Sequence, residues 1–279
     1  MMVEALENMD EGIIVGEQVV SDVRFAYDQG MVASTENGLQ KLMNKLNETA
    51  KKFNIKMNVQ KTKAMVMCRD GGGIVNIIID GEKVEQVASF KYLGSIITED
   101  GRSLNDVKAR IALAKDAFSK RKELLTKSLS KELKKRIVKV LVWPVVMYGC
   151  ETWTLRKAEI DKLQALEMWI WRRLENISWE QKIRNEEVLR RVKENRCLIT
   201  TIYRRQKNWI GHILRGDGLL RDVMEGRMMG KRPRGRPRAG MMDELMEGSY
   251  VNMKRRAEGR EEWRRWVPRT CLKAEYLYC

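Results

Sequence analysis

The chain has 279 residues, of which 43% are hydrophobic and 33% are charged. This length and composition exclude a largely disordered chain and allow one large domain or two ordinary ones. Lysine and arginine number 54 against 38 acidic residues, a net charge of +16. Residues 1–100 hold 11 basic and 15 acidic side chains, so residues 101–279 carry a net charge of +20. Such a field attracts polyanions, nucleic acid first and an anionic membrane surface second; simple solubility is the alternative explanation.

Cysteine and histidine usage argues against a metal centre. Five cysteines lie far apart without a C-x-x-C pair, and His212 is the single histidine. A structural zinc site needs about four such ligands in close pairs, so we expect free thiols in a reducing compartment. His212 is interpreted as a structural residue on a helix. The acidic start is not signal-like, and the longest apolar run, 140–150, is too short to span a bilayer. We expect a nuclear or cytoplasmic protein, neither secreted nor membrane-spanning.

The first hundred residues read as short strands and one helix. Residues 19–33 place β-branched and aromatic side chains around a turn with Asp28 and Gly30, which predicts a hairpin. Residues 37–53 carry their apolar side chains on one face and predict an amphipathic helix. Further strands are predicted over 55–69, 74–80 and 90–101, with turns at 70–73, 80–81 and 100–101.

After Gly101 the pattern becomes helical. Helices are predicted over 103–125, 131–143, 158–174 and 197–214. Ser130 is the expected N-cap of the second helix, and Pro144 is expected to kink or end it. The tryptophans of this half fall mostly on apolar stripes, so core packing is favoured over stacking on bases. From Gly216 onward periodicity fades, with short helices expected near 241–247 and 260–266.

Four segments together resemble a known family. They are KYLGSIITEDGR (91–102), VVMYGCETWTL (145–155), RRQKNWIGHILR (204–215) and GKRPRGRPR (230–238). With the order of hairpin, helix and strand before them, they resemble the C-terminal half of the endonuclease–reverse transcriptases of LINE-type (non-LTR) retrotransposons. The resemblance runs from about Gly12 to Arg238. It implies an α+β fold with a partial reverse-transcriptase palm (1–102), thumb-like helices (103–150), a helical C-terminal domain (151–215) and a basic, loosely structured tail (216–279).

The resemblance also bears on catalysis. In that family the palm hairpin ends in Phe/Tyr-Ala-Asp-Asp, and its first aspartate shares the catalytic Mg²⁺ ions with an earlier carboxylate. Here the tip reads Phe25-Ala26-Tyr27-Asp28, so Tyr27 replaces the first aspartate and Asp28 matches the second. The strands bearing the earlier aspartate and the endonuclease domain have no counterpart. We therefore expect a catalytically incomplete reverse transcriptase without an intact metal site or a cofactor. An ordinary turn residue is the alternative reading of Asp28.

Other positions match the family less specifically. Lys61 lies in an Asn-x-x-Lys-Thr stretch, and the resemblance implies that it would lie near the incoming nucleotide. The alternative interpretation is a solvated lysine at the end of a strand. Tyr92, Leu93 and Gly94 resemble the primer-grip turn, where glycine allows close backbone approach; plain hairpin packing is the alternative. The thumb-like helices offer cations for duplex phosphates, or simply a solvated face. These cations are Lys108, Arg110, Lys115, Lys120, Arg121, Lys134, Lys135 and Arg136.

Residues 230–240 contain a Pro-Arg-Gly-Arg-Pro core that resembles an AT-hook. Prolines keep such a segment extended, and its arginines enter the negative A·T minor groove. A nuclear-import signal or a linker is the alternative. The candidate DNA contacts are Lys231, Arg232, Arg234, Gly235, Arg236 and Arg238.

The favoured hypothesis is an inactive reverse-transcriptase fragment that still binds DNA or an RNA–DNA hybrid. It has no expected membrane partner or small-molecule substrate. A non-enzymatic AT-hook-type DNA-binding protein is the second hypothesis. In the third, a fuller polymerase chain supplies the missing palm strands in trans to an exposed sheet edge.

Overall fold

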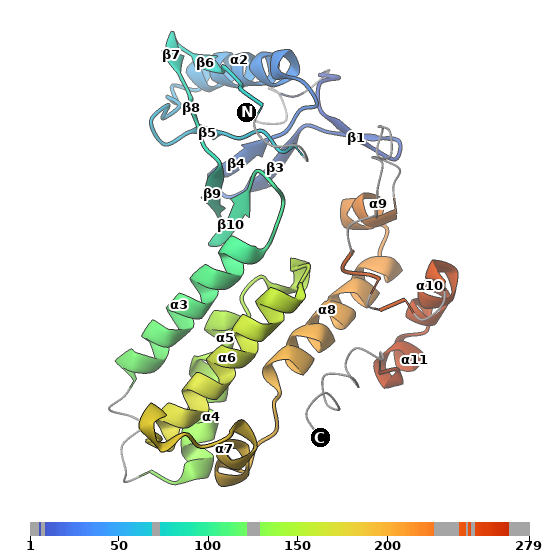
Figure 1. Cartoon of the computed structure of the whole chain (residues 1–279). Coiled ribbons are helices and arrows are strands. Elements are labelled where there is room, and N and C mark those ends of the chain that lie inside the picture. The colour runs from blue at the N-terminus through green and yellow to red at the C-terminus, as the bar shows by residue number, and fades with distance from the viewer. Residues whose placement is uncertain are drawn as a thin grey trace. The chain divides into compact units, whose positions relative to one another are not determined.

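The computed structural model describes residues 6, 9–68, 73–121, 129–225, 240–243, 245–246 and 249–267. Within them the chain is α+β, as predicted from the sequence: short strands precede a series of helices (Figure 1). The chain divides into two compact units. Residues 1–101 with 217–236 form the first unit, and residues 102–216 with 237–279 form the second.

The first unit contains five two-stranded sheets in its described residues. Four are antiparallel hairpins: β1 (Ile13–Val15) with β2 (Gln18–Val20), β3 (Asp22–Phe25) with β4 (Asp28–Met31), β6 (Ile78–Ile79) with β7 (Glu82–Lys83), and β9 (Ser89–Tyr92) with β10 (Ser95–Thr98). β5 (Lys63–Ala64) pairs in parallel with β8 (Glu85–Gln86). The predicted hairpin at 19–33 is confirmed as β3–β4. The strands predicted over 55–69 and 74–80 are wrong for most of their length, because only β5 and β6 form there.

Helix α2 (Glu36–Lys52) covers the apolar centre of the first unit. The hydroxyl of Thr35 accepts a hydrogen bond from the Gly38 N–H at 3.0 Å and so caps the helix. Its buried face carries Leu42, Met43 and Leu46. The predicted amphipathic helix is therefore confirmed, because one apolar stripe packs inward while lysines face water. The residues that pack with Met43 are Ala64, Val75, Ile77, Ile79 and Val84.

The second unit is helical in its described residues (Figure 1). Its helices are α3 (Leu104–Lys120), α4 (Lys131–Leu141), α5 (Trp143–Val146), α6 (Lys157–Leu174), α7 (Asn185–Val192), α8 (Leu198–Arg215), α10 (Tyr250–Glu258) and α11 (Arg260–Arg265), with 3-10 turns η2 (Cys150–Thr152) and η3 (Trp179–Gln181). The first unit also holds α9 (Leu219–Glu225). No helix of the described ranges is long and apolar enough to cross a membrane.

The four long helices predicted in the second half are confirmed. The hydroxyl of Ser130 accepts from the Leu133 N–H at 3.3 Å, and Pro144 lies in the first turn of α5, so α4 ends before it as expected. The helix expected near 260–266 is α11. The helix expected near 241–247 is wrong where the structure describes it, since residues 241–243 form a turn.

Tryptophan side chains form much of the second core. Trp143 and Trp171 are buried and meet edge to face, with ring centroids 5.7 Å apart. Trp153 is also buried, and its indole N–H donates to Asp106 at 2.9 Å. Core packing is thus confirmed for these three. Trp179 is 83% exposed and lies outside the core.

Two of the segments quoted for the family resemblance pack against each other. The buried side-chain amide of Gln206, on α8, donates to the carbonyls of Cys150 and Trp153 at 2.8 Å each. These carbonyls belong to η2 and the residue after it. Long-range packing of α8 on η2 therefore joins the 145–155 segment to the 204–215 segment.

Candidate nucleic-acid interface

The β3–β4 hairpin carries the tetrapeptide that resembles a polymerase tip. Ala26 and Tyr27 form the turn, and Phe25 is paired with Asp28. Tyr27 is 99% exposed, and Asp28 is exposed beside it. Asp22, at the other end of β3, is ion-paired with Arg24 on the same strand. The carboxylates of this hairpin are therefore not drawn together.

A magnesium pair does not fit these residues. Two Mg²⁺ ions need several oxygen ligands, with bridging carboxylates between them. Among the residues that the structure describes, no group of three His, Cys, Asp or Glu side chains could hold a metal ion. Tyr27 offers a neutral phenol in place of a carboxylate.

Lys61 belongs to a local turn. The side-chain oxygen of Asn58 accepts from the Lys61 N–H at 3.0 Å, and the Thr62 hydroxyl donates to the Asn58 carbonyl at 2.8 Å. Asparagine and threonine thus close the Asn-x-x-Lys-Thr stretch as turn residues. The side chain of Lys61 is exposed.

Tyr92, Leu93 and Gly94 shape the β9–β10 hairpin. Leu93 and Gly94 have φ angles of 47° and 85° and join Tyr92 to its partner Ser95. Two positive φ angles are typical of a type I′ turn, the form that matches strand twist. The Tyr92 hydroxyl donates to the Val23 carbonyl at 3.3 Å. The structure therefore brings Tyr92, on β9, beside β3. Strand β3 belongs to the hairpin that carries Tyr27 and Asp28.

The three predicted cations of α4 differ in availability. Lys134 is buried. The side chain of Lys135 is 12% exposed and lies 3.6 Å from the carboxylate of Glu194. Arg136 is exposed, and within the described part of the chain it has no ion-pair partner. Only Arg136 of this trio presents its charge outward.

Arg110 is also held inside the fold. Its guanidinium lies 4.3 Å from the centre of the Tyr148 ring and 3.8 Å from the carboxylate of Asp106. Asp106 in turn accepts from Trp153. Arg110 therefore stabilises the packing of α3 on the segment around Tyr148 rather than facing a ligand.

Helices α3 and α6 lie side by side (Figure 1). Both carry exposed cations near Trp169. The Arg173 guanidinium lies 4.3 Å, and the Lys115 ammonium 5.4 Å, from the Trp169 ring centre. Phe118 meets the same ring edge to face at 5.5 Å. A seven-residue spacing puts Lys108 on the face of Lys115 and Lys162 on the face of Trp169. We call this set, Lys108, Lys115, Lys162 and Arg173 around Trp169, the α3–α6 cationic surface.

The cations of this surface are available to an anion. None of the four forms an ion pair with an acidic side chain in the described ranges. The contacts on Trp169 hold two of them in place, since cation–π attraction of this kind contributes about 0.5–1 kcal/mol at exposed sites. By contrast, Lys131 and Lys139 are ion-paired at 2.9 and 2.8 Å.

Buried ionisable groups of the second unit have structural partners. Glu167 accepts from the N–H groups of Cys197 and Leu198 at 2.9 and 3.3 Å, at the N-terminus of α8. Burial raises the pKa of the Glu167 carboxyl, and these N–H groups oppose that shift. Burial likewise raises the pKa of the Cys150 thiol to about 12 and that of Cys197 to about 11. Neither thiol is a reactive nucleophile near neutral pH.

The AT-hook-like residues Lys231, Arg232, Arg234, Gly235, Arg236 and Arg238 lie outside the described residues. Among the described candidates, the structure groups Tyr92 with the Tyr27–Asp28 hairpin. It separates the buried Lys134 from the exposed Arg136. The cluster of Trp169 with Arg173 was missed by sequence reasoning. The four-residue spacing of Trp169 and Arg173 on a predicted helix was the available signal.

Comparison with known proteins indicates the origin of the chain. The chain is similar to an uncharacterized protein of Caenorhabditis elegans described as transposon-derived, with 23% identity over 210 residues. The aligned part covers 70% of this chain and 72% of that protein. No protein-family model matches the chain, and no solved structure matches it significantly. The similarity supports a transposon-related origin.

Proposed function

We propose that this chain binds nucleic-acid duplexes, DNA or RNA–DNA hybrid, through the α3–α6 cationic surface. The observation that carries the proposal is the pair Lys115 and Arg173, exposed on either helix, held against Trp169 and without acidic partners in the described residues. The net charge of +20 over residues 101–279 adds a long-range attraction to polyanions. Contacts of this kind go to backbone phosphates and carry no sequence preference.

In this proposal the chain derives from a LINE-type reverse transcriptase. Residues 1–102 correspond to part of its palm and the following helices to its thumb. The relative described as transposon-derived supports that origin. Tyr27 in place of a carboxylate, with no metal-holding group among the described residues, supports the absence of polymerase activity. The retained function is then binding without catalysis.

The test is the affinity of the full chain for a blunt duplex and an RNA–DNA hybrid over a series of salt concentrations. Four cations that each neutralise one phosphate give a log–log salt slope of about −3.6. The double variant Lys115→Met/Arg173→Met removes two of them, so we expect the slope to fall in magnitude by about 2. Methionine keeps the apolar stem of each side chain.

The matched control removes the same charge elsewhere. Arg255 and Arg264 are exposed on α10 and α11. The variant Arg255→Met/Arg264→Met should keep most of the parent slope. Equal losses in the two double variants would show that net charge alone drives binding and would refute the proposed surface.

A second candidate function rests on the Pro-Arg-Gly-Arg-Pro segment. An AT-hook prefers A·T-rich to G·C-rich duplexes, because the A·T minor groove is narrow and strongly negative. A preference for A·T-rich duplex that disappears in Arg234→Ala/Arg236→Ala would favour this second function over the α3–α6 surface.

A further inference from the structure

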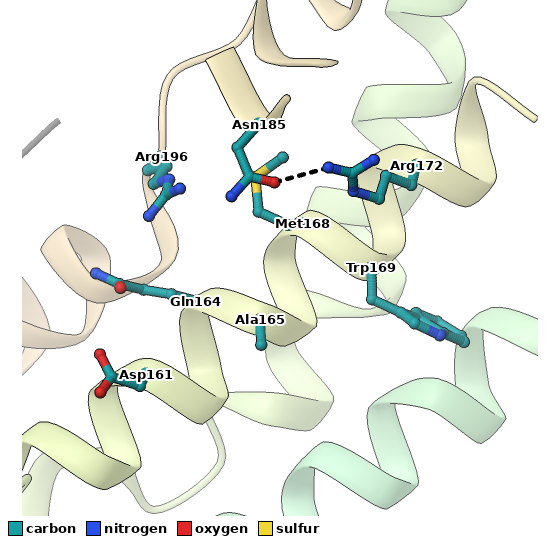
Figure 2. Close-up of a pocket in the computed structure, with 8 residues that line it drawn as sticks. All are labelled: Asp161, Gln164, Ala165, Met168, Trp169, Arg172, Asn185 and Arg196. Atoms are coloured by element: carbon teal, nitrogen blue, oxygen red, sulfur yellow. Dashed lines mark hydrogen bonds between the residues drawn. The ribbon is translucent and has the colours of Figure 1, made fainter. Parts of the chain in front are cut away.

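A cleft of about 420 Å³ beside α6 is lined by polar side chains that the fold already engages (Figure 2). The Arg172 guanidinium donates to the side-chain oxygen of Asn185 at 2.9 Å, the bond drawn in Figure 2. The Asp161 carboxylate lies 3.0 Å from the ammonium group of a lysine on the same helix. Gln164 and Arg196 have partners of their own as well. These side chains therefore hold the helices together and are not offered to a ligand.

Strand β3, in the first unit, has an outer edge without a neighbouring strand. It pairs with β4 alone among the strands that the structure describes. The Val32 N–H donates to the Ser21 carbonyl at 2.8 Å, so these two residues form a hydrogen-bonded pair beside the registered strands. Hydrogen-bonded and non-hydrogen-bonded pairs alternate along an antiparallel ladder. Val23 therefore directs its backbone groups toward β4, whereas Asp22 and Arg24 direct theirs outward.

The face of the hairpin that carries Val23 and Phe25 is also uncovered. Their side chains are 49% and 63% exposed. A methyl group added at Gly30, which is paired with Val23, would meet only the Val23 carbonyl, at 3.8 Å, in the described residues. A two-stranded hairpin is marginally stable by itself, whereas three or more strands that share an apolar face support one another. This hairpin therefore gains stability from a strand that extends it across β3.

The charges of β3 select which strand can be added. Asp22 and Arg24 are two residues apart, so they lie on one face of the strand, where they form an ion pair. If two copies of β3 run antiparallel with Val23 opposite Val23, Asp22 of each copy lies opposite Arg24 of the other. Each charge then keeps its neighbour along the strand and gains an opposite charge across it, which stabilises the pairing. An edge protected by lysines alone would bring like charges together.

The same register matches the backbone groups. Asp22 and Arg24 are the residues whose N–H and C=O groups point outward, and this register makes them hydrogen-bonded partners at two symmetric positions. Val23 then meets its copy in a non-hydrogen-bonded pair, the type in which opposite side chains approach most closely. Charge, backbone and apolar contact therefore all fit one arrangement of two identical strands.

We propose that the outer edge of β3 joins two copies of this chain in a twofold-symmetric dimer. The two hairpins form one four-stranded antiparallel sheet in the order β4–β3–β3–β4. Such an interface uses the same surface on both copies, so it closes after two and does not propagate. Four residues a side bury less than the roughly 1,000 Å² of stable complexes, so we expect a Kd on the order of 10–100 μM. This association requires no nucleic acid.

Charge reversal on β3 tests the register. Arg24→Glu and Asp22→Lys each place like charges opposite one another at both symmetric positions, so each should weaken self-association of the full chain roughly tenfold. An equimolar mixture of the two variants restores opposite charges across the strands, and heterodimers should form with about the parent affinity. Sedimentation velocity over a concentration series, without nucleic acid, measures the association. Lys83→Glu makes the same reversal on exposed β7 of another hairpin and should leave the dimer unchanged.

The mixture separates loss of pairing from loss of folding, because variants that dimerise only together must both be folded. If Asp22→Lys does not fold, Val23→Lys takes its place: this exposed position lies on the axis, and two opposed lysines should give a monomer. Thermal unfolding establishes that each variant used is folded.

Three results would overturn the dimer. A parent that is monomeric at about 500 μM, well above the expected Kd, leaves the edge to a strand of another protein. Dimers that persist unchanged in folded Arg24→Glu, or folded variants that stay monomeric when mixed, refute the register. Duplex binding through Lys115 and Arg173 is a separate property, since these residues belong to the second unit, and it stands or falls by its own test.

Discussion

Leu93 occupies a backbone conformation that suits another residue. Its φ of 47° lies in the left-handed region, which costs a leucine about 1–2 kcal/mol. A type I′ turn favours asparagine before glycine, and Gly94 already follows. Leu93 is 38% exposed, so the loss of its apolar contacts offsets part of this gain. We expect Leu93→Asn to stabilise the first unit by about 0.5–1 kcal/mol, measured as a higher urea midpoint at unchanged slope.

Leu93→Val is the control for this turn. A β-branched residue is strongly disfavoured at positive φ, so the urea midpoint should fall. A midpoint that rises with valine as much as with asparagine would mean that the leucine side chain, and not the backbone, sets the effect.

Glu167 predicts a pH dependence with a definite sign. Its folded pKa is raised above the ordinary value of 4.5 by burial. At a pH between the unfolded and the folded pKa, the carboxyl is protonated in the folded chain and ionised in the unfolded chain, so unfolding releases a proton. The contribution of Glu167 to stability therefore falls as pH rises above 4.5. A glutamine oxygen can still accept from Cys197 and Leu198 without bearing a charge. We expect the unfolding free energy of Glu167→Gln, relative to the parent, to rise as pH increases above 4.5.

Glu187 is the control, because its pKa is shifted in the opposite direction to that of Glu167. Hydrogen bonds from Arg190 and Arg191 lower its pKa to about 2. Its contribution is present above the ordinary pKa and is lost as pH falls toward 2. Chemical denaturation should therefore show Glu187→Gln less stable than the parent above pH 4.5, with the difference in unfolding free energy shrinking as pH falls from 4.5 toward 2. Parallel curves for the two variants would contradict both assignments.

At the scale of elements, a glycine sets how α11 packs on α8. A methyl group at Gly211 would lie 2.1 Å from the indole nitrogen of Trp263. That indole N–H donates to the Lys207 carbonyl at 3.0 Å. The Lys207 ammonium in turn reaches the carbonyl of Trp266, just past the C-terminus of α11. Close approach of α11 thus depends on the missing side chain.

We expect Gly211→Ala to destabilise the second unit by about 1–2 kcal/mol. Overpacking costs about 1–3 kcal/mol, and the better helix propensity of alanine offsets up to about 1 kcal/mol. Equilibrium unfolding followed by tryptophan fluorescence measures the change. Gly218→Ala, where nothing lies within 4 Å of an added methyl, should leave stability nearly unchanged. An alanine at 211 that stabilises the protein would show that α11 is not packed there.

The elements also differ in how well the sequence predicts them. The long helices were predictable because apolar residues recur every three or four positions over many turns. The strands of the first unit are two to four residues long. So short a strand contains too few positions to show an alternating pattern, and its pairing depends on partners far along the chain.

At the scale of the whole molecule, the proposed function is binding without polymerisation, which can be tested directly. We expect no templated primer extension by the full chain with Mg²⁺ or Mn²⁺, because Tyr27 supplies no carboxylate and no group of three potential metal ligands includes Asp28 among the described residues. Incorporation of labelled nucleotide above a no-enzyme background would contradict this. Tyr27→Asp is the informative variant: restored activity would show that a single side chain was missing, whereas continued inactivity is expected.

The candidate site was only partly predictable. The cation count of the second half and the exposed Arg136 could be anticipated from composition and helix pattern. The burial of Lys134 and the capture of Lys135 by Glu194 could not, because Glu194 lies 59 residues from Lys135 along the chain. Sequence spacing also gave no sign that Lys115 of one helix would meet Trp169 of another.

The sequence by itself determined that a strand-containing half precedes a helical half, the long helices, the positive charge of the second half and the tyrosine at the hairpin tip. These properties are local: they follow from composition and from periodicity within one segment. Only the tertiary structure decided which of the described cations are free and where Tyr92 and Trp263 make contact. Those outcomes depend on close packing between distant segments, where shape, burial and hydrogen-bond partners are fixed together rather than residue by residue.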